Sequence, residues 1–298
     1  MTDRTAWTFT DDRGRLVSAD LRPSRVLAYV QAGATLWDFG ICPEGVFGSG
    51  HDGAAPDRAR TGTLPLDSVD YRGAGGGLDV ETLLRGRPDL VVAVSYGQGQ
   101  VYGLDPATAE HLEERVPVVV IDVGQVRTLD RTVARFAELA RSLGAAPAEA
   151  VTPELEEARG RLRAVAGAAS GGPGVMALSP AGAEQVHVAR PRMWPELRVL
   201  AELGVTLAGP EEGAGVNWAT VGWAAAAVLR PRVVLTDVRA NAARIEEAGD
   251  PEWRRTVRQA RIVPWNPEPL CSPGAHARFL HLVADALEEA GTAGAPGV

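Results

Sequence analysis

Short runs of apolar, mostly β-branched residues alternate with amphipathic stretches along most of the chain. The runs are continuously apolar, without the polar alternation of a half-exposed sheet, which is typical of parallel strands covered by helices on both faces. On this basis we predict strands at residues 26–30, 45–47, 90–94, 117–121, 174–178, 205–207, 232–236 and 260–263.

Helices are predicted between these strands. Residues 129–143 carry apolar side chains at helical spacing, and Thr152, Pro153 and Glu154 combine an N-cap, a first-turn proline and an acid at the positive end of a helix. The predicted helices lie at residues 34–39, 106–115, 129–143, 154–169, 195–203, 220–229, 240–248 and 272–290.

This order predicts an α/β protein with two Rossmann-like βα lobes. Residues 1–150 are predicted as the N-terminal lobe, 151–172 as a single long linker helix and 173–298 as the C-terminal lobe. Parallel βα units place ligands at the carboxyl ends of their strands. We therefore expect a ligand cleft between the lobes, formed by the loops that follow the strands.

Charge and composition exclude several classes of function. The chain has 298 residues and a net charge of −8, which argues against a nucleic acid or an anionic membrane surface as partner. All 30 basic residues are arginine. Without lysine, Schiff-base chemistry, pyridoxal phosphate attachment and a Walker A site are excluded. Every basic side chain is therefore a planar guanidinium, which can bind a carboxylate or phosphate through two hydrogen bonds.

From the residues at its start, we expect no signal peptide in the sequence as given. Its start is charged and lacks the apolar core of a signal peptide, no lipid-attachment cysteine lies near it, and no stretch is apolar enough for a transmembrane helix. Cys42 and Cys271 are too few and too far apart for a disulfide framework. We expect a cytoplasmic monomer; the alternative is an exported lipoprotein whose N-terminal segment is missing from this sequence.

A series of motifs from Thr8 to Ala290 resembles one known family. The motifs are TFTDDRGRLVSADLRPSRVLAYVQAGATLWDFGI, LDVETLLRGRPDLVVAVSYG, VPVVVIDVG, ELGVTLAG and W-x-T-V-x-W-A-A-A-A-V-L-R-P-R-V-V-L. Together they resemble class III periplasmic substrate-binding proteins, which serve importers of ferric siderophores, haem and cobalamin. The resemblance implies two α/β lobes joined by a stiff helix, with a small molecule bound between them and no catalysis.

Two features depart from the family. Members usually carry a signal peptide with a lipidated cysteine, and they usually present one glutamate on each lobe to arginines of an ABC permease. Asp105 and Glu196 are the acids nearest those positions here. A permease is therefore an expected partner only if the protein is exported.

In the first lobe, the candidate ligand-binding residues follow or approach strands. Tyr96 comes directly after the 90–94 strand, and Tyr102 is a weaker second candidate. Ser49 and His51 lie in the loop after residues 45–47. Arg72, in a glycine-rich segment, is either an anchor for an anionic ligand, as the resemblance suggests, or an exposed loop arginine.

In the second lobe, arginines and tryptophans provide the candidates. Arg192 and Trp194 form a basic and aromatic pair after the first strand of this lobe, and Trp265 follows its last strand. Arg239, beside Asp237, is either a ligand clamp or a surface residue. Trp218, two positions before the predicted 220–229 helix, is ambiguous, whereas core packing is expected for Trp223 and Trp253.

The sequence gives little evidence for a metal site or a catalytic motif. His51 and His187 give two metal ligands at most, short of the three or four a site needs, so iron is expected only inside a bound chelate and no cofactor is expected. Neither GxSxG nor HExxH occurs, although Ser49 and Ser95 lie in cleft loops.

The first functional hypothesis is therefore non-enzymatic binding of an anionic or chelate-type small molecule, such as a ferric siderophore. The alternative is a cytoplasmic enzyme or accessory protein of natural-product biosynthesis that reuses this fold, because fold alone does not fix function. A third hypothesis is a ligand sensor that signals to a partner protein.

Overall fold

The computed structural model describes residues 6–97, 99–168, 174–211 and 215–293. The chain divides into two compact units. The first unit comprises residues 1–151 together with the short segment Glu268–Pro273, and the second comprises residues 152–267 and 274–298.

The first unit contains a five-stranded, fully parallel sheet of order β5-β4-β3-β6-β7. Its strands are β3 (Val26–Tyr29), β4 (Gly45–Gly48), β5 (Asp70–Ala74), β6 (Leu90–Ser95) and β7 (Val118–Asp122). The strand order reverses between β3 and β6, and such a switch point is where open α/β sheets bind ligands at their carboxyl edge.

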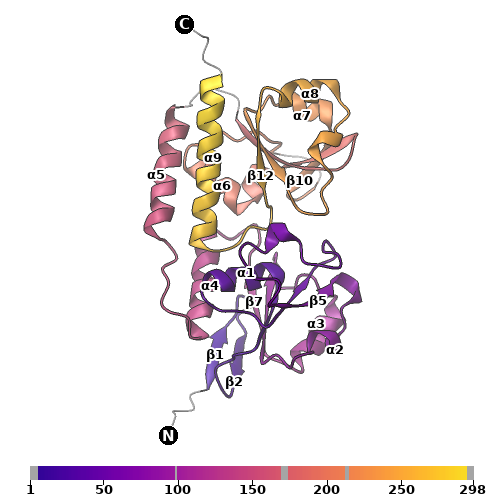
Figure 1. Ribbon diagram of the computed structural model, residues 1–298, viewed down its shortest axis with the longest axis vertical. Coiled ribbons are helices and arrows are strands. Elements are labelled where there is room, and N and C mark those ends of the chain that lie inside the picture. The colour runs from indigo at the N-terminus through magenta and orange to yellow at the C-terminus, as the bar shows by residue number, and fades with distance from the viewer. Residues whose placement is uncertain (1–5, 98, 169–173, 212–214, 294–298) are drawn as a thin grey trace. The chain divides into compact units, whose positions relative to one another are not determined.

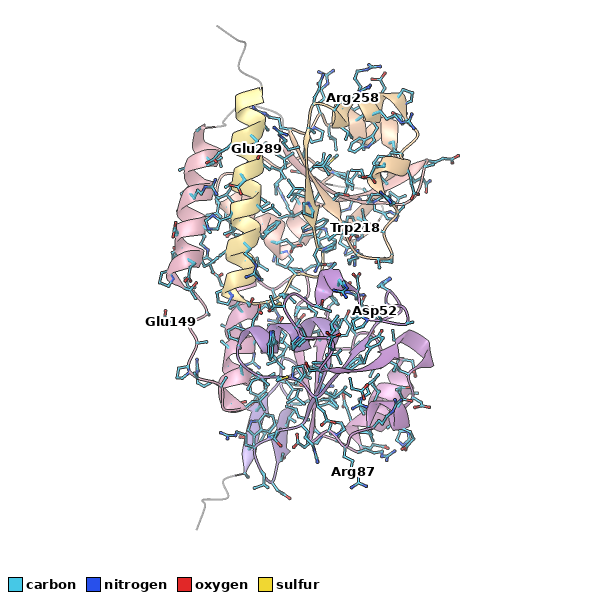
Figure 2. The ribbon with its side chains drawn as sticks, viewed as in Figure 1. Asp52, Arg87, Glu149, Trp218, Arg258 and Glu289 are labelled. Carbon is cyan, nitrogen blue, oxygen red and sulfur yellow. The ribbon has the colours of Figure 1, made fainter. Side chains whose placement is uncertain are left out.

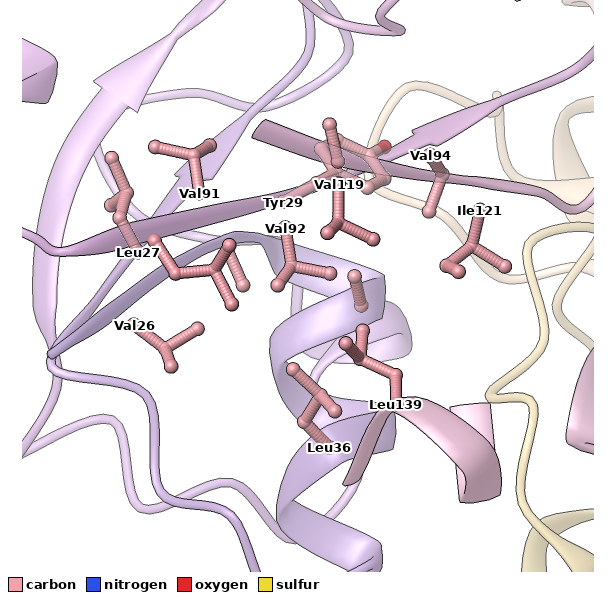
Figure 3. Close-up of a cluster of buried hydrophobic side chains, with 14 of the residues drawn as sticks. Val26, Leu27, Tyr29, Leu36, Val91, Val92, Val94, Val119, Ile121 and Leu139 are labelled. Carbon is pink, nitrogen blue, oxygen red and sulfur yellow. The ribbon is translucent and has the colours of Figure 1, made fainter. Parts of the chain in front are cut away.

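Helices cover both faces of this sheet (Figure 1). Helices α1 and α4 contact one another and the sheet, while α2 and α3 contact each other. Their bounds are α1 (Val30–Asp38), α2 (Val80–Leu83), α3 (Pro106–Glu113) and α4 (Leu129–Ser142), with short 3₁₀ turns η1 (Arg58–Arg60) and η2 (Gly75–Gly77). Figure 3 shows strand residues such as Val92 and Val119 packed toward Leu36 of α1 and Leu139 of α4, which explains why continuous apolar runs form these strands.

An antiparallel hairpin, β1 (Trp7–Thr10) and β2 (Leu16–Ala19), precedes the sheet and was not predicted. Ion pairs hold it: the guanidinium of Arg135 on α4 lies 2.7 Å from Asp12, and that of Arg13 lies 2.7 Å from Asp11. The hairpin therefore owes part of its stability to charges on its turn rather than to apolar alternation.

The second unit has a mixed sheet of order β10-β9-β8-β11-β12, in which β8, β11 and β12 are parallel and β9 and β10 are antiparallel to their neighbours. The strands are β8 (Val175–Pro180), β9 (Gln185–Ala189), β10 (Trp218–Gly222), β11 (Val233–Asp237) and β12 (Arg261–Trp265). The helices are α5 (Pro153–Ala168), α6 (Pro195–Glu202), α7 (Trp223–Ala227), α8 (Pro251–Val257) and α9 (Pro273–Ala293), with 3₁₀ turns η3 (Pro191–Met193) and η4 (Ile245–Glu247).

Alternate residues of the central strands serve two separate cores. Val175 and Ala177 of β8 pack with α5, α6 and α9, whereas Met176 and Leu178 pack with Trp223 and Trp253 of α7 and α8. The second unit is therefore a three-layer α/β/α structure, and the core positions predicted for both tryptophans are confirmed.

The predicted α/β class is confirmed, but several assignments are corrected. Helix α5 is not a separate linker, because Leu155 and Leu162 belong to the core of the second unit, and Glu268–Pro273 returns to the first unit. The predicted helix 220–229 is strand β10 followed by α7. The predicted helix 240–248 contains only η4, and the predicted strand 205–207 forms a single bridge, Val175 to Leu207.

Among the described residues, no helix is both long and apolar enough to cross a membrane.

Candidate functional site

Three tyrosines gather at the switch point of the first unit. Tyr29 ends β3 and Tyr96 follows β6, the two strands that flank the switch point. The Tyr102 ring lies between them, with its centroid 4.7 Å from that of Tyr96 and 5.5 Å from that of Tyr29, both edge to face. The carboxyl edge of this sheet therefore carries an aromatic cluster in which Tyr29 is buried and Tyr96 and Tyr102 are partly exposed; the ligand-binding role of Tyr96 and Tyr102 stays a prediction.

The Tyr96 hydroxyl is buried and makes no hydrogen bond within the described residues. Burial raises the pKa of this phenol well above its ordinary value, and the nearby Glu268 carboxylate raises it further. Tyr96 is therefore a neutral phenol with a donor and an acceptor that no described group satisfies, which is costly unless a ligand or water supplies the partner.

Beside the tyrosines lies a fully buried arginine, Arg60, at the end of η1. Its guanidinium lies 2.6 Å from Asp52, 3.1 Å from Glu268 and 3.9 Å from Asp57. It also donates to the Tyr29 hydroxyl at 2.8 Å, and that hydroxyl donates to Glu268 at 2.8 Å. We call Arg60 and these three carboxylates the Arg60 cluster.

The Arg60 cluster has more negative than positive groups: one guanidinium faces three carboxylates. Burial alone would lower the pKa of Arg60, but Tyr29, Glu268 and Asp52 more than offset this, so the pKa is raised and the guanidinium stays charged. The Arg60 guanidinium is already paired with carboxylates of the protein. Arg60 therefore cross-links the loop after β4 to Glu268 and is not positioned to bind an anionic ligand.

The segment Glu268–Pro273 is fastened to α1, which holds Glu268 in place. The Gln31 amide donates to the Pro269 carbonyl at 2.6 Å, and the Cys271 backbone donates to the Thr35 hydroxyl at 3.1 Å. The Ser272 hydroxyl donates to Asp38 at 2.5 Å.

The other candidate residues of the first unit, Ser49, His51 and Arg72, lie in different environments. Ser49 is buried in the Arg60 cluster, where its hydroxyl accepts from Arg60 at 3.3 Å, whereas the His51 side chain is exposed. Arg72 is a correction: it lies within β5 and its guanidinium is buried against Asp70 at 2.5 Å and Glu44 at 3.6 Å.

Arg72 lies at the wrong end of the sheet for an anchor. Glu44 precedes β4, and Gly86, which borders the Arg72 guanidinium, lies before β6, so this pair marks the amino ends of the strands. Figure 2 shows the neighbouring Arg87 and the site residue Asp52 at opposite ends of the first unit.

In the second unit, Trp194, Trp218 and Trp265 form one aromatic cluster, which the sequence did not predict. Their ring centroids are 4.8 to 5.8 Å apart, in edge-to-face arrangements. Trp194 and Trp265 are almost fully buried, whereas Trp218 is half-buried and has His187 6.3 Å away. Trp218 is thus the member that a ligand can reach.

Glu196 lies beneath this tryptophan cluster. It accepts a hydrogen bond of 3.2 Å from the Trp265 indole and is almost fully buried. Burial raises the pKa of its carboxyl from 4.5 to about 7. Glu196, one of the two acids nearest the family's docking positions, is therefore buried rather than presented at the surface. Asp105, in contrast, is the exposed N-cap of α3.

The two candidate arginines of the second unit, Arg239 and Arg192, differ in how firmly their side chains are held by neighbouring groups. Arg239 pairs with the buried Asp237 through two nitrogens, the closer contact being 2.8 Å, at the carboxyl end of β11. Arg192 is largely exposed and lies 3.7 Å from Glu211. Asp237 therefore orients Arg239, whereas Arg192 has only an exposed carboxylate beside it.

The Arg60 cluster and the buried state of Glu196 were missed by sequence reasoning. The acid-rich loop HDGAAPDRAR after β4 was the available signal for Asp52, Asp57 and Arg60. In the described part of the chain, no group of three or more His, Cys, Asp or Glu side chains is placed to hold a metal ion.

Comparison with known proteins shows which solved structures share this fold. No family model and no curated protein matches the sequence. Solved structures do match: the chain has the two-lobe fold of class III periplasmic substrate-binding proteins, which confirms the resemblance noted in the sequence.

Among these structures, DesE, a ferric-siderophore receptor protein from Streptomyces coelicolor, matches with a TM-score of 0.84 and 28% identity, over 95% of this chain and 98% of DesE. FhuD from Vibrio cholerae, solved with Fe³⁺-Desferal bound, matches with a TM-score of 0.63 and 17% identity over 90% of this chain and 98% of FhuD. The haem-binding protein RhuT from Roseiflexus sp. RS-1 matches with a TM-score of 0.61 and 17% identity, over 90% and 98% of the two chains.

Proposed function

We propose that this chain binds a ferric siderophore without chemically changing it, as a solute-binding protein of iron uptake. The single observation that carries the proposal is the match to DesE along nearly the whole of both chains, at 28% identity. The aromatic surfaces of the two units support it, because flat rings pack against the organic shell of an iron chelate. That one ligand contacts both units remains a prediction from sequence.

The charge of the first unit's site favours one class of chelate. Ferric tris-hydroxamates are close to neutral, whereas ferric tris-catecholates carry several negative charges. The Arg60 cluster holds three carboxylates against one guanidinium beside Tyr29. Because like charges repel strongly where water is excluded, we propose hydroxamates in preference to catecholates. This revises the anionic ligand that the sequence suggested.

The binding proposal is tested by tryptophan fluorescence with Fe³⁺-Desferal. We expect saturable quenching, and we expect a ferric tris-catecholate to bind more weakly by about tenfold or more. Trp218→Leu should weaken Fe³⁺-Desferal binding by about tenfold, since it removes the half-buried ring. Trp37→Phe, at a half-buried position on α1 outside the cluster, is the control and should bind normally. No quenching by either chelate would refute the proposal.

Tyr96 allows a second, sharper test. Tyr96→Phe removes a hydroxyl that has no partner in the described residues, so stability should stay the same or rise slightly, while affinity for Fe³⁺-Desferal should fall by about tenfold. Tyr29→Phe is the matched comparison, because its hydroxyl bridges Arg60 and Glu268. It should lower the free energy of unfolding by about 1–3 kcal/mol. Unchanged affinity in Tyr96→Phe would remove Tyr96 from the site.

A further inference from the structure

A concave site lies in the second unit, at α7 and α8 and away from the tryptophan cluster. A pocket of about 430 Å³ is bounded by α7, by the turn that follows it and by α8. Arg232, which lines the pocket, directly precedes β11, whereas Asp237 ends that strand. The pocket is therefore at the amino end of β11, about 13 Å along the strand from Asp237. Figure 2 likewise shows Arg258 of this region and Trp218 far apart in the second unit.

The pocket is positively charged although the chain as a whole has a net charge of −8. Arg230, Arg232 and Arg255 line it, and Glu252 is the one carboxylate among its lining residues. Glu252 pairs with Arg255 at 2.9 Å, but both side chains are about 60% exposed, so this pair is weak and can open for a stronger partner. Arg232 also lines the pocket, and its guanidinium donates to the Ala290 carbonyl of α9 at 3.0 Å, so one of its nitrogens is already engaged outside the pocket.

Arg230 has a strained backbone. Its φ is 43°, in the left-handed region that disfavours residues with a Cβ, and within the described residues only Arg87 shares this among non-glycines. Glycine would relieve the strain, yet the position carries a long cation that faces the pocket. Strain kept at a pocket-lining charged residue points to a role for the side chain.

The rest of the lining is apolar, formed by Ala224, Ala227, Val228 and Pro231. Val228 is 76% exposed, which leaves a hydrophobic surface beside the three arginines. Arginine forks recognise the oxygens of phosphates and carboxylates, and the apolar wall suits a small hydrocarbon body.

We propose that this pocket binds a small organic oxyanion, a phosphate or carboxylate attached to an apolar group. The site is separate from the siderophore-binding residues, because it lies at the opposite ends of the strands that carry Asp237 and Trp265. The ligand would be held by Arg230, Arg232 and Arg255, with its apolar part against Val228 and Pro231.

The test is isothermal titration of the full chain with phenyl phosphate, and separately with inorganic phosphate and with phenol. We expect one saturable site for phenyl phosphate, with each fragment binding about tenfold more weakly or worse. Arg230→Gly and Arg255→Gln should each weaken phenyl phosphate binding by about tenfold. Arg230→Gly should also unfold at a higher temperature, since it relieves the backbone strain, so a loss of binding is not a loss of fold.

Arg258→Gln is the matched control, because Arg258 follows α8 but does not line the pocket. It should change the affinity less than twofold or so. All three variants should bind Fe³⁺-Desferal as the unmodified chain does, which separates this proposal from the siderophore proposal. No saturation by phenyl phosphate up to roughly 10 mM would overturn the proposal, and so would an equal loss in Arg258→Gln.

Discussion

Replacing Arg60 with methionine is expected to lower the free energy of unfolding by about 3–5 kcal/mol. The methionine fills much of the same volume but leaves Asp52, Asp57 and Glu268 without their shared cation. The Asp52 and Glu268 side chains are 0% and 4% exposed, so water cannot replace the guanidinium. Urea unfolding of the variant beside the unmodified chain measures the loss.

Arg72→Met is the matched control for Arg60→Met. Arg72 is also buried, but its partners Asp70 and Glu44 are 52% and 34% exposed and can be hydrated when the cation is removed. The expected loss is therefore smaller, about 1–2 kcal/mol. Equal losses in the two variants would contradict the structural role assigned to the Arg60 cluster.

A double variant separates lost packing from unpaired charge. Adding Glu268→Gln to Arg60→Met removes one of the stranded carboxylates while keeping an acceptor for the Tyr29 hydroxyl. The double variant should be more stable than Arg60→Met alone, because the coupling between residues of one ion-pair network is not additive. If the second substitution only adds a further loss, the destabilisation comes from packing.

The parallel strands were predictable because each is buried on both faces, which leaves a continuous apolar run in the sequence. The antiparallel part of the second unit was not. In β10, the run Trp218–Gly222 is buried unevenly and is followed at once by the alanine-rich α7, so the two elements together mimic one amphipathic helix. Tertiary pairing with β9 decides between strand and helix there.

The site was predictable where a strand end alone places the residue. The positions of Tyr96 and Trp265 follow directly from the ends of β6 and β12, but the sequence did not show that Trp265 is almost fully buried. Arg72 failed because proximity to a strand does not say which end of it the side chain reaches. The contact between Arg60 and Glu268 spans 208 positions of sequence, so no local pattern could bring the two together.

The pH dependence of stability is expected to change when Glu196 becomes glutamine. Burial raises the pKa of Glu196 from 4.5 to about 7, so between these values the folded chain keeps a proton that the unfolded chain has released. The stabilisation from this group is fully present below pH 4.5 and is lost as the pH rises through about 7. The shift corresponds to about 3 kcal/mol.

Glu196→Gln cannot release that proton, and its side chain keeps an acceptor for the Trp265 indole. The variant should match the unmodified chain in stability near about pH 4 and exceed it by up to about 3 kcal/mol near about pH 8. Urea unfolding across this range measures the difference. Glu202→Gln, at an exposed position of the same helix α6, is the control: its free energy of unfolding should depend on pH as that of the unmodified chain does.

The same ionisation should be visible in the tryptophan cluster. Trp265 donates to Glu196 and lies edge to face with both Trp194 and Trp218, so a charge appearing on Glu196 changes the field on three adjacent indoles. Fluorescence of the ligand-free chain should therefore titrate with a midpoint near 7, and Glu196→Gln should abolish that titration. A midpoint near 7 that persists in Glu196→Gln would contradict the buried, neutral state of Glu196 below pH 7.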